Sequence, residues 1–316
     1  MKRFVKIYTY WLLGILLFTG CDDYLKEDSG DLLIPGKVEE FLPMLYREGF
    51  PRNFDDEVAW LYLMTDDVEM GQLELDPDDE NNDTRDKNSV DAFSVGEGEE
   101  PYKWERDIKS YADNFWERRY GNILACNLVI DALPEMVYVE ADSGSYNFLA
   151  AQAYAMRAYH YWCLVNSYAL PWSKENLDEP GVVIRTEPQI DIAARRRSSI
   201  REVYDLINED IENAEKYIKV ATFDGNIHRL SEPAILLLAS RIALFQENWD
   251  EVIRTGKLFL AQNSIILNLN DQDTTLFGTE KGLSNKIFTM MDGTINKEVV
   301  FTFGTSSYSP YQYLST

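Results

Sequence analysis

The sequence predicts a mainly α-helical fold of stacked helix pairs, with irregular loops and a small strand-containing region towards the C-terminus. Two observations predict the helices: apolar side chains recur at three- and four-residue steps over most of residues 114–267, and prolines or capping residues bound these runs. A third observation is that this period is lost further along the chain. We therefore divide the chain into a leader (1–20), an irregular segment (21–113), helical repeats (114–267) and the start of an irregular C-terminal region (268–316).

The leader has the layout of an export signal. Three basic residues stand within the first six positions, followed by the apolar stretch Trp11–Phe18 and a small Thr-Gly pair before Cys21. The apolar stretch is shorter than the roughly 20 helical residues needed to cross a hydrocarbon core of about 30 Å. The sequence Leu-Phe-Thr-Gly-Cys resembles the bacterial lipobox, and Asp22 and Asp23 after it resemble a surface-export signal. We therefore expect a lipid on Cys21; the alternative is ordinary cleavage that leaves a free thiol there.

The segment 21–113 shows no long helical period. Its apolar residues gather in two short patches, Val38–Leu45 and Val58–Met64, and Asp76–Asn88 is almost wholly polar, which is typical of a solvated loop. Alternate oxygen-bearing side chains in this loop could bind calcium, but a proline interrupts them. The glycine and the distal glutamate of a calcium loop are also absent, so we assign no metal site.

The helical region opens with two long runs, each followed by a proline. Apolar residues at helical spacing in Phe115–Leu133 predict an amphipathic helix of about five turns. Tyr146–Tyr168 is apolar nearly all round, which predicts a helix packed on several sides. Cys126 and Cys163 fall in these helices, and we expect two free thiols rather than a disulfide, since free thiols are common in helical cores.

A third helix is expected to end near Ile218. Ser198 or Ser199 can cap its first turn, with Glu202 as the reciprocal partner of a capping box. The preceding basic run, Arg195–Arg197, could bind an anion. In a chain with so many carboxylates, we expect these arginines to form ion pairs instead.

Two more apolar stripes follow, Ala234–Phe245 and Val252–Leu260. Ser231 suits the cap of the former, and Pro233 suits its first turn. Two antiparallel helices joined by a tight turn resemble the tetratricopeptide unit, so we expect degenerate repeats of such helix pairs. Further on, Glu298–Phe303 predicts a short strand.

Composition and motifs exclude several classes of function. The chain has 54 acidic and 30 basic residues and a net charge of −24, so it is repelled by nucleic acid, which we exclude as a partner. With so many carboxylates, acidic pairs occur by chance and do not indicate a glycosidase. His160 falls on a helix, where we expect it in the core or at its boundary, and His228 falls on a turn. Because no metalloprotease, nucleophile-elbow or phosphate-loop motif is present, we assign no catalytic residue, metal or cofactor.

Five blocks, in order along the chain, resemble the SusD/RagB family of Bacteroidetes outer-membrane lipoproteins. They are the lipobox followed by Asp-Asp-Tyr-Leu-Lys-Glu; Trp116, Tyr120, Ile123 and Asn127; Ala151–Trp172 with Arg157; Arg197, Ser198, Val203, Tyr204, Ile207 and Asp210; and the helix pair Ala234–Phe259. Ala169 departs from the pattern, since the family usually has glycine there. Relatives are also longer, which implies that the C-terminal part of their ligand site is missing from this chain.

The resemblance implies a non-enzymatic lipoprotein on the outer face of the outer membrane. Such a protein captures oligosaccharide, or peptide, and passes it to a SusC-like TonB-dependent transporter. Two alternatives stay open: a structural subunit that docks the transporter without binding ligand, and a cryptic glycoside hydrolase.

The resemblance also places part of the ligand site on Phe50–Trp104. Sugar binding needs flat aromatic faces and polar side chains that hydrogen-bond to hydroxyl groups. From this segment we take two stacking aromatics and three polar partners as candidates: Trp60, Trp104, Arg52, Asn53 and Asp55. For each aromatic the competing interpretation is core packing, since large aromatics are mostly buried.

Overall fold

The computed structural model describes residues 37–51, 64, 103–104, 109–136, 138–189, 194–266 and 298–302. Its helices are α2 (Val38–Glu48), α5 (Lys109–Ala132), the short 3-10 helices η2 (Leu133–Glu135) and η3 (Glu140–Asp142), α6 (Ser143–Tyr168), α7 (Ile200–Ile218), α8 (Glu232–Phe245) and α9 (Trp249–Gln262). Outside the described residues lie Cys21, the candidates Trp60, Arg52, Asn53 and Asp55, and the polar stretch Asp76–Asn88. The predicted mainly helical fold is confirmed.

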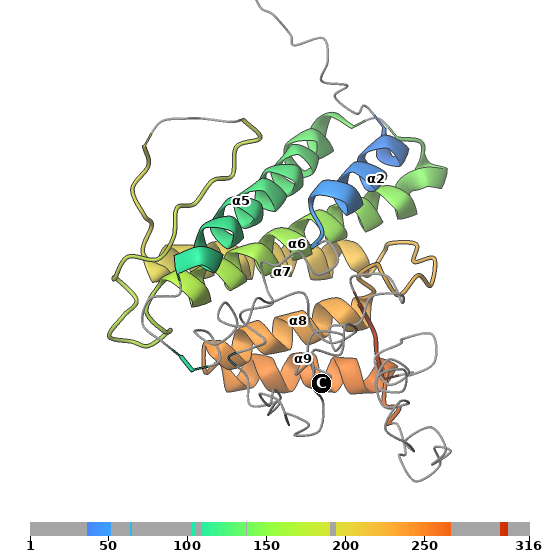
Figure 1. The fold of residues 1–316 in the computed structure, drawn as a ribbon. Helices are drawn as coiled ribbons and strands as arrows, with labels where there is room; N and C mark the ends of the chain where they lie inside the picture. Colours follow the sequence, from blue (N-terminus) through green and yellow to red (C-terminus); the bar gives the residue numbers. More distant parts are fainter. Residues whose placement is uncertain are drawn as a thin grey trace, which may run out of the picture. The chain divides into compact units, whose positions relative to one another are not determined.

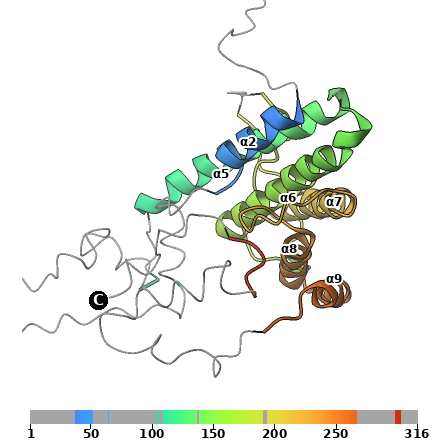
Figure 2. The ribbon, with the colours of Figure 1, turned by 90° about the vertical axis from the view of Figure 1, so that its right-hand side faces the viewer.

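Helix α6 is the centre of the packing. It contacts α2, α5, α7 and α8, and the longer helices follow one another in space in the order α5, α6, α7, α8, α9 (Figure 1 and Figure 2). Buried alanines such as Ala151, Ala155 and Ala158 line its middle. Their small side chains let the neighbouring helices approach closely. The expected helix packed on several sides is therefore confirmed.

A buried polar network joins α5, α6 and α7. The guanidinium of Arg157 donates two hydrogen bonds to Asp210, at 2.8 and 2.7 Å, and one to the side-chain oxygen of Asn127 at 2.9 Å. The Asn127 amide in turn donates to the carbonyl of Arg185 at 2.9 Å. Burial raises the pKa of Asp210 to about 6, although the hydrogen bonds from Arg157 act in the opposite direction. The network therefore ties three helices and the loop after α6 to one another.

The predicted helix caps are present. Ser199 and Glu202 form a capping box: the Ser199 hydroxyl accepts from the Glu202 backbone N–H at 3.2 Å, and the Glu202 carboxylate accepts from the Ser199 N–H at 2.7 Å. Ser231 caps α8 by accepting from the backbone N–H of Ala234. Both caps satisfy N–H groups that a helix start leaves without intrahelical partners.

The basic run before α7 behaves only partly as expected. Arg195 forms an ion pair with Glu187 at 2.9 Å, as predicted. Arg197 instead donates to the backbone carbonyls of Gly181 and Tyr168. It therefore fastens the end of α6 to the loop that precedes α7.

Three further predictions are corrected. Val38–Glu48, in the segment expected to be irregular, is a helix whose buried residues Val38, Phe41 and Leu45 share one face. Helix α5 starts at Lys109, before the first apolar residue of the predicted run. Residues 298–302, the described part of the expected strand, form no strand; Thr302 makes a single backbone hydrogen bond, to the carbonyl of Ile227.

Helices α8 and α9 form a helical hairpin joined by the short turn 246–248 (Figure 1). They pack side by side, as the repeat interpretation requires, and their membership of the tetratricopeptide class stays a prediction. Cys126 and Cys163 are free thiols. Among the residues that the structure describes, no helix is both long and apolar enough to cross a membrane.

Candidate functional site

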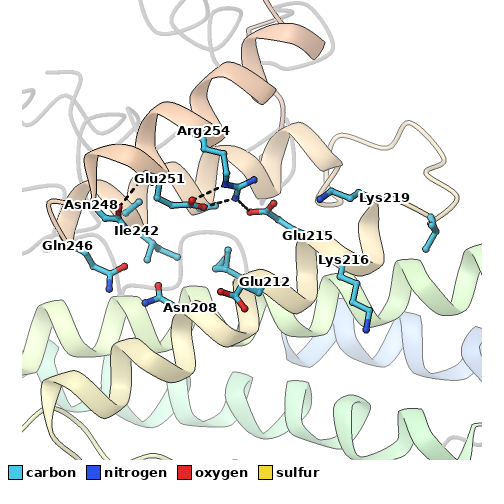
Figure 3. A pocket seen from close by; sticks show the side chains of 14 residues that line it. Asn208, Glu212, Glu215, Lys216, Lys219, Ile242, Gln246, Asn248, Glu251 and Arg254 are labelled. Carbon is cyan, nitrogen blue, oxygen red and sulfur yellow. Dashed lines mark hydrogen bonds and ion pairs between the residues drawn. The ribbon is translucent and has the colours of Figure 1, made fainter.

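A pocket of about 690 Å³ lies between α7 and the α8–α9 hairpin (Figure 3). Polar residues make up most of its lining: Asn208, Glu212, Glu215, Lys216, Lys219, Gln246, Asn248, Glu251 and Arg254. Its apolar lining consists of Ile211, Val220, Ala239, Ile242 and Ala243. No aromatic side chain is among these described lining residues.

Helix α7 presents one face to the core and an adjoining face to the pocket. Its core stripe includes Val203, Ile207 and Ala214, all fully buried. Glu212, Glu215 and further polar residues at helical spacing, up to Lys219, lie on the pocket side. The same amphipathic helix therefore forms both the wall of the core and one wall of the pocket.

An ion-pair network within the pocket lining joins α9 to α7. Arg254 binds Glu251 through two hydrogen bonds, at 2.8 and 2.5 Å, and reaches across to the carboxylate of Glu215 on α7 at 2.6 Å (Figure 3). The hydrogen bonds that Arg254 donates to these two carboxylates raise its pKa. The Glu251 backbone N–H is itself held by the side chain of Asn248, which caps α9. The network thus fixes α9 against α7.

The charges along the pocket balance. The lining contains three acidic residues, Glu212, Glu215 and Glu251, and three basic ones, Lys216, Lys219 and Arg254. A balanced set of donors and acceptors favours a neutral ligand with many hydroxyl groups over a strongly charged one. Within the described residues, no group of three or more His, Cys, Asp or Glu side chains is placed to hold a metal ion. The arrangement therefore indicates binding by hydrogen bonds.

Of the candidate residues predicted from the sequence, the structure describes Trp104. Its side chain is 69% exposed and its backbone has a positive φ of 55°. Core packing, the competing interpretation for this aromatic, does not hold. Phe50, at the other end of the predicted site segment, is buried and packs edge-on against Tyr46 with ring centroids 5.0 Å apart.

The pocket was not predicted from the sequence. The polar positions of α7 were visible at helical spacing beside the core stripe, but a solvated helix face shows the same pattern. Only the position of α9, which brings Glu251 and Arg254 opposite α7, turns that face into the wall of a pocket.

Comparison with known proteins identifies the family to which this chain belongs. Residues 51–244 match the model of a family described as SusD-like, starch-binding and associating with the outer membrane. The chain belongs to the SusD-like family. The match covers α5 to α7 and nearly all of α8, together with Trp104, whereas α9 lies beyond it.

Three relatives illustrate the similarity. A SusD-like protein of Formosa agariphila is 28% identical over 158 residues, which is 49% of this chain and 27% of that protein. A solved SusD-like carbohydrate binding protein from Bacteroides vulgatus has a TM-score of 0.54 at 18% identity, covering 82% of this chain and 54% of that one. A laminarin binding SusD-like protein has a TM-score of 0.52 at 17% identity, covering 72% of this chain and 44% of that one.

The structural similarities establish the fold. This SusD-like chain spans between about a quarter and about half of the length of these relatives.

Proposed function

We propose that this chain is a glycan-binding lipoprotein of the outer membrane that captures oligosaccharide and delivers it to a SusC-like TonB-dependent transporter. The observation that carries the proposal is the family match over residues 51–244, which bears the description starch-binding and associating with the outer membrane. The balanced polar pocket supports it, since neutral sugars are recognised through hydroxyl groups by such side chains.

The proposal includes a lipid on Cys21 as the attachment to the membrane. A chain with a net charge of −24 is repelled by anionic headgroups, so a covalent anchor supplies an attraction that the protein surface lacks. Cys21→Ala should move the protein from the membrane fraction to the soluble fraction. Continued retention of the variant in membranes would contradict the anchor.

Trp104 is the first residue to test within the ligand site proposed for Phe50–Trp104. An exposed indole offers a flat apolar face on which the C–H surface of a sugar ring can stack. Trp60, Arg52, Asn53 and Asp55 remain proposed partners in the same site. Trp104→Ala should weaken glycan binding, and an unchanged affinity would remove this residue from the site.

The absence of aromatics from the described lining of the pocket favours one alternative: a structural subunit that docks a transporter through its helices. Affinity electrophoresis in gels that contain neutral polysaccharides separates the two functions. The proposed function predicts retardation by at least one polysaccharide. The docking function predicts no retardation, while the transporter still co-purifies. Release of reducing sugar by the purified protein would instead indicate a hydrolase.

A further inference from the structure

Four tyrosines pack ring to ring across α6, α7 and the loop that precedes α6. We call them the tyrosine ladder, which consists of Tyr138, Tyr146, Tyr154 and Tyr217. Tyr138 stacks on Tyr146 with ring centroids 4.2 Å apart and an interplanar angle of 20°. Tyr146 meets Tyr217 edge-on at 6.4 Å. Tyr217 in turn lies parallel to Tyr154 at 5.9 Å, so the rings form a continuous path.

The ladder is anchored on its inner side. Tyr146, Tyr154 and Tyr217 are half-buried and pack against the core cluster that contains Phe148 and Leu149. Because their positions are fixed by this packing, little conformational entropy would be lost when a ligand settles on them.

The ladder is open on its outer side. Tyr138 is 42% exposed. Within the part of the chain that the structure describes, the hydroxyls of Tyr138, Tyr154 and Tyr217 have no hydrogen-bond partner, and those of Tyr154 and Tyr217 are not buried. Burial and the neighbouring Tyr217 raise the pKa of Tyr154, so its phenol is neutral at physiological pH and can both donate and accept.

Two tyrosines with a purely structural role behave differently. Tyr120 donates to the carbonyl of Val183 at 2.6 Å, and Tyr161 donates to the carbonyl of Arg185 at 2.7 Å. Their hydroxyls form hydrogen bonds that hold a loop against the helices. In the ladder, three hydroxyls remain available for a ligand, although the rings are held in place.

Lys216 connects the ladder to the pocket. It lines the pocket on α7, and its ammonium nitrogen lies 5.7 Å from the centroid of the Tyr217 ring. Its side chain points away from Arg254 (Figure 3). The ladder therefore adjoins, through one lysine, a polar pocket with balanced charge.

We propose that the tyrosine ladder is a stacking platform for an extended neutral oligosaccharide whose chain continues past Lys216 into the pocket. This inference rests on the proposed function and assigns it a second binding surface, separate from Phe50–Trp104. Sugar rings present apolar C–H faces to the tyrosines and hydroxyl groups to the phenols and to the pocket. A single sugar contacts only one part of this surface, so affinity should rise with chain length.

The test compares binding of neutral oligosaccharides, from disaccharide to heptasaccharide, by isothermal titration calorimetry. The oligosaccharides are taken from starch, laminarin, xylan and mannan, and the protein is the purified full chain. Tyr138→Ala and Tyr217→Ala each remove one aromatic ring, and Tyr138→Phe removes only a hydroxyl. Trp249→Ala is the matched control, since Trp249 is 59% exposed on α9 but belongs to neither the ladder nor the pocket lining.

Each alanine variant in the ladder should bind long oligosaccharides roughly tenfold more weakly than the wild type, with a smaller loss for the disaccharide. Tyr138→Phe should lose less, and Trp249→Ala should bind as the wild type does. Circular dichroism of each variant shows whether it is folded. Tyr138 lies outside the α-helices, so replacing its side chain should leave the helices intact.

The two proposals fail in different ways. If the wild type binds no oligosaccharide, the proposed function fails and the ladder proposal fails with it. If the wild type binds and both alanine variants match its affinity, the ladder proposal alone is overturned. Loss of transporter co-purification with unchanged glycan affinity would identify the ladder as a protein contact and would also overturn the proposal.

Discussion

His160 gives the sharpest test of the packing around α6. It is fully buried: its Nε2 lies 2.7 Å from the carbonyl oxygen of Gly49, and its Nδ1 lies 3.1 Å from a guanidinium nitrogen of Arg119. A carbonyl can only accept and a guanidinium can only donate, so Nε2 carries the proton and the ring is neutral. Protonation of Nδ1 would remove its acceptor and place a second positive charge beside Arg119.

Burial and the charge of Arg119 together lower the pKa of His160 from 6.5 to about 3. The unfolded chain therefore takes up a proton on this residue near neutral pH, whereas the folded chain does not. The stability that comes from this difference is fully present above pH 6.5 and is lost as the pH falls towards the folded pKa. Between about pH 7.5 and about pH 5, we expect the free energy of unfolding to fall by about 2 kcal/mol through His160 alone.

The assay is urea denaturation of the wild type and of His160→Gln at both pH values. The glutamine amide can still donate to the carbonyl of Gly49 but does not titrate. The chain has two histidines, so His228→Gln, on the exposed turn before α8, is the matched control. Carboxylates titrate alike in all three proteins, and their contribution cancels when the proteins are compared.

The wild type should lose about 2 kcal/mol more than His160→Gln as the pH falls, and His228→Gln should follow the wild type. An equal loss in the wild type and in His160→Gln would refute the reasoning, because it would show that the folded protein accepts a proton on His160 without cost.

Three further substitutions test separate contacts. Asp210→Ala should lower the free energy of unfolding, measured by urea denaturation, by about 3–5 kcal/mol, because it leaves the buried guanidinium of Arg157 without its partner. The double variant Arg157→Met/Asp210→Leu removes both charges and should lose less stability. A larger loss in the double variant would contradict this account. Gly181→Ala should lower the free energy of unfolding by about 1–3 kcal/mol, since the added Cβ would lie 3.0 Å from two backbone carbonyl oxygens. In Gly256→Ala on α9 the added Cβ meets nothing within 4 Å, so this variant should be more stable by about 0.5–1 kcal/mol. Thermal unfolding that ranks the two variants in the opposite order would argue against both predictions. Ser199→Ala removes the cap of α7 and should cost about 1 kcal/mol in the same assay, and no loss would mean that the capping box contributes nothing.

The helices were predictable where one physical signal dominated. Helix α6 is a long apolar run ended by a proline, α7 has a regular apolar period, and α8 follows a serine cap and a proline. The capping box at Ser199 is a local pattern that needs no tertiary information. Helix α2 was missed because it is short and contains Pro43, so local signals argue against it while packing on α5 and α6 supports it.

The predicted strand failed for a related reason. The residues Glu-Val-Val-Phe-Thr-Phe from Glu298 are rich in β-branched and aromatic side chains, which gives high strand propensity, but a strand needs a neighbour with which to pair. Among the described residues, the Thr302 N–H donates to the carbonyl of Ile227, and the Thr302 carbonyl lies 3.0 Å from a ring nitrogen of His228. High strand propensity alone was therefore not enough to form a strand in residues 298–302.

The family blocks were predictable as a pattern, but the reason for some of their residues is visible only in three dimensions. Asn127, Arg157 and Asp210 come from three separate blocks and meet in one buried network. These positions hold three helices together. The pocket and the tyrosine ladder could not be predicted, because each combines residues from elements that the sequence does not place side by side.

Glycan binding by the purified chain is the central claim, and titration calorimetry with neutral and uronic-acid oligosaccharides of matched length tests it most directly. The account predicts saturable binding of at least one neutral oligosaccharide. It also predicts weaker binding of the anionic counterpart, since the chain carries a net charge of −24. Absence of binding to every oligosaccharide, or tighter binding of the anionic ones, would contradict it.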